Sequence, residues 1–103
     1  MAHRRASDDD TTRTALDRCR PAAIAQVIHE LLSQRSGDKT ICPSEAARAL
    51  LPDGDWRGLM DAVRSVAVDE VRAGRLEIRQ RGEVVDGATT QGPIRLGRPS
   101  DRP

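Results

Sequence analysis

The sequence predicts a winged helix-turn-helix, a mainly α (α+β) domain of three helices and a small antiparallel β-sheet wing. Two observations predict this class. Thr40–Gly74 has the pattern of a short extended segment, a short helix, a tight turn and a longer helix. A pair of arginine-rich strand patterns follows between Arg75 and Arg98. Because one more helical pattern precedes Thr40, the order of elements is that of a winged helix.

The first helix is predicted to begin near Pro21, since proline is well tolerated in a first turn. Ser36-Gly37-Asp38 should end it. Before it, residues 1–20 are polar and predicted to be a disordered arm, and residues 99–103 a disordered tail, so that the domain itself spans 21–98. Apolar residues at helical spacing give the helix one buried face: Ile24, Val27, Ile28, Leu31 and Leu32.

A second helix should follow a brief extended segment at Thr40 and Ile41. Pro43 suits its first position, and Cys42 occupies the capping position, where a thiol accepts hydrogen bonds poorly. Its inner face is expected to be Ala46, Ala47, Leu50 and Leu51.

The third helix should begin after the Pro52-Asp53-Gly54 turn, with Asp55 as its N-cap. Gly74 is its predicted terminator. Its apolar stripe comprises Leu59, Met60, Val63, Val66, Ala67 and Val71.

The wing is predicted from alternating patterns at 76–80 and 92–96, typical of half-buried strands. Arg81-Gly82 allows a turn, Val84-Val85 could pair briefly, and residues 86–91 form a loop.

Composition bounds the function classes. The chain has 103 residues, enough for one domain, and a formal net charge of +1, so no global field draws it to nucleic acid or to anionic lipid. The chain lacks Asn and has one lysine, so a GC-rich genome explains the many arginines without any function. Two cysteines, no signal peptide and no membrane-spanning run predict a soluble cytoplasmic protein without a membrane partner.

Several motifs lie in the same order as in a known family: TICPSEAARAL at 40–50, DWRGLM at 55–60, Val63-Arg64, Gly74-Arg75, Gln80-Arg81-Gly82 and GPIRL at 92–96. With these motifs the chain resembles a family of small bacterial domains of unknown function that have a winged-helix-like plan. The resemblance covers about residues 22–98 and implies the fold. It implies no activity and no binding residue.

The third helix supplies the first candidate site. In a winged helix its N-terminal half enters the major groove. Arg57 and Arg64 lie seven residues apart, two turns on one outer face, with Ser65 beside them. An arginine fork matches guanine or phosphate. Asp61 lies between the two arginines and would repel phosphate, pair with either arginine or accept from cytosine, so a plain solvated face is the competing interpretation.

The wing supplies the second candidate site. Arg79, Arg81 and Arg95 could contact phosphates or an adjacent minor groove. Arg79 shares a predicted strand face with Glu77 and Arg81, so a surface ion pair is the alternative.

Other chemistry-bearing residues favour structural roles. Trp56 is expected to pack at the corner between the second and third helices rather than to stack on a base. Cys42 is expected to be an unreactive, small buried residue at the junction of the extended segment and the second helix, although a position at a helix start favours the thiolate form. The spacing of the cysteines and histidines does not suit zinc, and no catalytic set is present, so we expect no metal, no cofactor and no enzymatic activity.

Two functions stay open at this level. Double-stranded DNA binding by a small transcriptional regulator is the first, with the third helix and the wing as the interface. A protein–protein interaction module, favoured by Asp61 and the near-neutral charge, is the second. A homodimer formed by the arm or the first helix stays open, as does a monomer.

Overall fold

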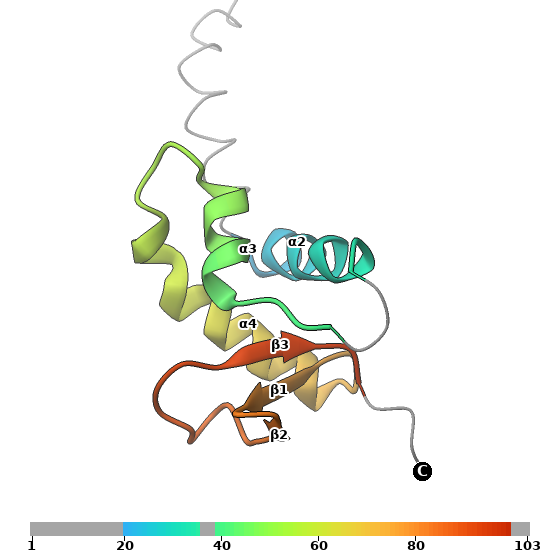
Figure 1. The fold of residues 1–103 in the computed structure, drawn as a ribbon. Coiled ribbons are helices and arrows are strands. Elements are labelled where there is room, and N and C mark those ends of the chain that lie inside the picture. Colours follow the sequence, from blue (N-terminus) through green and yellow to red (C-terminus); the bar gives the residue numbers. More distant parts are fainter. Residues whose placement is uncertain (1–19, 36–38, 100–103) are drawn as a thin grey trace, which may run out of the picture.

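Three α-helices and a small antiparallel sheet make up the structure, a computed structural model that describes residues 20–35 and 39–99 (Figure 1). The predicted arm and tail, and the predicted end of the first helix at 36–38, lie outside these residues except at Arg20 and Pro99. The elements are α2 (Pro21–Ser33), α3 (Pro43–Leu50), the 3-10 turn η1 (Trp56–Leu59), α4 (Met60–Arg72), β1 (Glu77–Gln80), β2 (Glu83–Val84) and β3 (Arg95–Gly97). This is the predicted winged-helix order.

The sheet has the strand order β2-β1-β3, with both pairs antiparallel. An isolated bridge joins Ile41 to Leu96, and each residue's amide donates to the other's carbonyl at 2.8 Å. The predicted extended segment before α3 is therefore confirmed. It lies beside β3, so it ties the start of the helix-turn-helix to the wing.

The core lies between the three helices and one face of the sheet. The α4 helix runs along the sheet, behind β1 and β3 in Figure 1, and contacts β1. Ile78 and Leu96 are fully buried on this face. Because side chains alternate along a strand, the paired residues Arg79 and Arg95 lie on the opposite, outer face. The sheet thus separates α4 from these two arginines.

The helix starts follow the predicted signals, with one difference. The Glu45 carboxylate accepts from the Cys42 amide at 2.8 Å, which is the reciprocal half of a capping box. Asp55 caps as predicted, accepting from the Gly58 amide at 3.3 Å. The same amide also donates to the Asp55 carbonyl at 3.1 Å, an i to i+3 bond. The predicted third helix therefore begins as the 3-10 turn η1, and α4 starts at Met60.

The wing differs from its prediction at β3. This strand covers Arg95–Gly97, later than the pattern at 92–96, because Gly92 has a φ of +90° and Pro93 has no amide to donate to a ladder. The predicted turn after β1 is confirmed, with φ values of +55° at Arg81 and +84° at Gly82. Positive φ at both central residues is typical of the tight turn that joins two antiparallel strands.

Candidate nucleic-acid interface

The outer face of η1 and α4 carries the residues that the sequence placed there. Arg57, Asp61 and Ser65 are exposed, and Arg64 is half-buried. On the opposite side of the helix, Val63 is fully buried in the core. The helical stripe therefore orients this face as predicted, and Asp61 remains on it.

Arg64 joins α4 to the wing. Its guanidinium donates to the Gly92 carbonyl at 3.3 Å and to the Thr90 carbonyl. These carbonyls belong to the loop that leads into β3, so the loop and α4 lie side by side. The sequence predicted Arg64 as a residue that reads DNA. The structure places it at the junction of helix and wing, with part of its donor fork occupied.

Trp56 is half-buried and packs against the core at the corner between α3 and α4, as predicted. The guanidinium carbons of Arg48 and Arg57 lie 4.5 and 4.6 Å from the centre of its ring. Such contacts hold a cation in place by the charge distribution of the ring. Trp56 thus positions two exposed arginines at this corner. Sequence analysis missed Arg48, because only the folded turn brings α3 to this ring.

On the outer face of the sheet, Arg79 pairs with Glu77 at 3.0 Å, and both side chains are largely buried. The ion pair that competed with a phosphate contact is therefore present. Arg81 does not share the strand face with Arg79, because β1 ends at Gln80 and Arg81 lies exposed in the turn.

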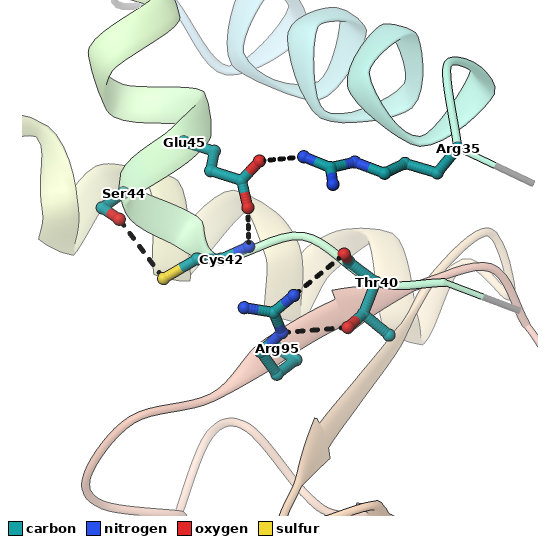
Figure 2. A network of polar contacts seen from close by, with 6 residues as sticks. All are labelled: Arg35, Thr40, Cys42, Ser44, Glu45 and Arg95. Carbon is teal, nitrogen blue, oxygen red and sulfur yellow. Dashed lines mark hydrogen bonds and ion pairs between the residues drawn. The ribbon is translucent and has the colours of Figure 1, made fainter.

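Arg95 turns toward the segment before α3 (Figure 2). Its Nε donates to the Thr40 hydroxyl at 2.9 Å and its Nη2 to the Thr40 carbonyl at 3.0 Å. Nearby, Arg35 pairs with Glu45, which links α2 to α3. These groups border an open depression of about 390 Å³, which we call the basic depression; it is lined by Arg35, Lys39, Thr40, Arg79, Gly82 and Arg95.

The arginines of the structure therefore differ in their partners. Within the described residues, one group forms no ion pair with a carboxylate: Arg48, Arg57, Arg64, Arg81 and Arg95. All except Arg95 lie on the helix-turn-helix or on the wing turn beside it, and we call Arg48, Arg57, Arg64 and Arg81 the turn-and-wing surface.

A charge cluster around one buried carboxylate joins α2, α4 and the residue that precedes Leu76 and β1. The Glu70 carboxylate is 2.7 Å from His29 Nε2 and accepts two hydrogen bonds from Arg75, both at 3.0 Å. Glu70 is 7% exposed. The hydrogen bonds from Arg75, and then that from His29, lower the pKa of Glu70 from its ordinary value of 4.5 to about 2. The same pairing raises the pKa of Arg75.

Sequence analysis missed this cluster, although one signal was present. Glu70 follows Val66 and Ala67 at helical spacing, so it interrupts the apolar stripe of α4. A carboxylate at such a position needs partners from neighbouring elements.

The remaining candidates from the sequence are Cys42 and the possible metal ligands. Cys42 is half-buried and its sulfur accepts from the Ser44 hydroxyl at 3.2 Å (Figure 2). In the part of the chain that the structure describes, no three His, Cys, Asp or Glu side chains gather as metal ligands, and His3 and Cys19 lie outside it. None of the described helices has the length and apolar character to cross a membrane.

The helices, the turn and the wing define a winged helix-turn-helix domain. The chain belongs to the family described as "Protein of unknown function (DUF3253)", which matches residues 21–99. This match confirms the resemblance to a domain family of unknown function. The comparison with curated proteins gives no match.

Proposed function

We propose that this domain binds double-stranded DNA through the turn-and-wing surface, as a small transcriptional regulator would. The observation that carries the proposal is the placement of arginines that have no carboxylate partner among residues 20–35 and 39–99. The helix-turn-helix carries three of them, Arg48 in α3, Arg57 in η1 and Arg64 in α4. The turn between β1 and β2 carries Arg81. These are the two elements with which this architecture contacts a duplex.

Each residue has a role in this arrangement. Arg57 and Ser65 face the major groove from η1 and α4, where an arginine fork suits guanine and a hydroxyl suits a base edge or a phosphate. Arg64 lies beside them with both Nη atoms donating to loop carbonyls, and its remaining N–H groups suit a phosphate. Arg48 and Arg81 flank them and suit phosphate contacts. The proposal is narrower than the sequence-based one, because Arg79 and Arg95 lie on the face of the sheet opposite α4.

A fluorescence anisotropy titration of a labelled mixed duplex at low salt tests this proposal. Arg57→Gln should weaken binding by about 1–3 kcal/mol, because one guanidinium contact is lost. The matched control is Arg72→Gln, which removes the same charge from the exposed last turn of α4. The proposal fails if the wild-type chain does not bind, or if both variants weaken binding equally.

One observation favours a protein-docking module as the second candidate. Asp61 is exposed in the first turn of α4, between Arg57 and Arg64, where it would approach the phosphates of a duplex. If the face binds DNA, Asp61→Asn should strengthen duplex binding several-fold by removing this repulsion. A duplex affinity that does not change with Asp61→Asn would instead favour the docking of a protein on this face.

A further inference from the structure

The basic depression adjoins the surface proposed for DNA at the wing turn, where Gly82 of its lining follows Arg81, but its principal cations do not belong to that surface. It is formed by the outer face of β1 and β3, the β1–β2 turn and the segment before α3. The α4 helix packs on the other face of the sheet, so Arg79 and Arg95 of the depression lie on the side of the sheet away from α4. An inference about it therefore goes beyond the proposed function and does not depend on it.

The depression has a cationic lining that is only half neutralised. Two of its four cations, Arg35 and Arg79, pair with Glu45 and Glu77. Lys39 and Arg95 have no carboxylate partner among residues 20–35 and 39–99. Two positive charges therefore remain at one concave place, which favours an anion with more than one negative charge.

Arg95 is already oriented for binding. Both hydrogen bonds to Thr40 fix its guanidinium plane, and its Nη1 donates to no residue that the structure describes. A fixed guanidinium plane loses little side-chain entropy when it binds, and its fork suits the oxygens of a phosphate. Lys39 is exposed, lines the same depression and adds a second cation.

The size of the depression favours a small ligand. About 390 Å³ lies at the lower end of the range for small-molecule sites. Gly97 helps to shape this face, because a methyl group there would lie 3.0 Å from the Thr40 methyl and 3.5 Å from the Arg79 guanidinium carbon. The close packing of Thr40 and Arg79 over β3 thus depends on glycine.

We propose that the basic depression binds a small phosphorylated compound, with Arg95 and Lys39 as the principal contacts to its phosphate oxygens. The phosphates of a nucleic acid share this chemistry. The test therefore includes both a compact phosphate compound and a duplex.

Isothermal titration calorimetry of the full chain with pyrophosphate, at constant ionic strength, tests the proposal. We expect saturable binding that weakens about tenfold or more in Arg95→Gln, because a charge-assisted fork is lost. Lys39→Gln should also weaken it, and this variant removes no described hydrogen bond. Arg72→Gln, the control with the same change of charge, should bind as the wild type does.

Three results would overturn the proposal: no binding of pyrophosphate, equal binding by wild type and Lys39→Gln, or equal weakening in Arg72→Gln. A duplex titration supplies the last arm. If Lys39→Gln and Arg95→Gln weaken duplex binding as strongly as pyrophosphate binding, the depression belongs to a nucleic-acid surface and the small-ligand proposal is wrong. Failure of DNA binding in the wild type would affect only the proposed function.

Discussion

Two regions of the molecule differ in the partners of their arginines. The first is the charge cluster of His29, Glu70 and Arg75, which we call the seam, and the second is the turn-and-wing surface. At the seam, Arg75 and His29 hold a carboxylate that is almost completely buried. On the turn-and-wing surface, an aromatic ring holds Arg48 and Arg57 and loop carbonyls hold Arg64. A carboxylate partner neutralises the arginine of the first region. Ring and carbonyl partners orient Arg48, Arg57 and Arg64 in the second region, and none of these three has a carboxylate partner in the part of the chain that the structure describes.

This difference matters in a chain that is rich in arginine and has a formal net charge of only +1. The number of arginines then says nothing about binding. The partner of each arginine does, because a carboxylate cancels a full positive charge, whereas a ring or a carbonyl carries only partial charge and leaves the net charge in place. If this account is correct, substitutions at the seam change stability and substitutions on the turn-and-wing surface change binding.

The largest effect is expected at the seam. Glu70→Gln should lower the free energy of unfolding at neutral pH by about 2–3 kcal/mol, because a carboxylate whose pKa falls from 4.5 to about 2 on folding stabilises the folded state by that order. Denaturant unfolding measures this loss. DNA binding by the folded variant should be unchanged.

The lowered pKa of Glu70 also predicts how the stability of the protein changes with pH. Since folding lowers the pKa of Glu70, its contribution is complete above pH 5 and is lost as the pH falls toward 2. The wild type should therefore lose stability over this range, and Glu70→Gln should lose clearly less. Parallel curves for the two proteins would show that Glu70 is not the group responsible.

An intermediate effect is expected at the corner between α3 and α4. Arg48→Ala should weaken duplex binding by about 1 kcal/mol, because a phosphate contact is lost. Stability should change by less than about 1 kcal/mol, the usual value of an exposed cation–π contact. A large loss of stability with no change in duplex affinity would assign Arg48 to the scaffold, and the two regions would then not differ as proposed.

The smallest effect is expected in the wing turn. Arg81 has a φ of +55°, a conformation that asparagine tolerates better than arginine. Arg81→Asn should therefore raise stability by about 0.5–1 kcal/mol and weaken duplex binding slightly. Thermal unfolding and anisotropy on one preparation measure both. Unchanged duplex binding would remove the wing turn from the proposed surface.

The elements could be predicted from the sequence because their signals are local. Pro21, Pro43 and Asp55 mark helix starts, and Gly74, with a φ of +79°, ends α4 as predicted. Two boundaries differ from the prediction. The α4 helix starts later because the i to i+3 bond at Gly58 forms the 3-10 turn η1, and β3 starts later because Pro93 has no amide to donate.

The site was predicted less completely because its contacts join distant segments. The Arg79–Glu77 pair lies within one strand and was visible as an alternative. Contacts such as Arg95 with Thr40, or Arg48 with Trp56, depend on how elements pack, and no spacing in the sequence encodes them. The same holds for the meeting of Arg35 and Lys39 with the sheet.

The salt dependence of duplex binding tests the central claim most directly. Anisotropy titrations of a mixed duplex, from low to physiological salt, should be made with the wild type and with the double variant Arg48→Gln, Arg81→Gln. If both arginines contact phosphates, binding should weaken with salt and the slope of log affinity against log salt should be shallower by about two in the variant. No binding by the wild type, or equal slopes for the two proteins, would contradict the claim that the turn-and-wing surface holds DNA.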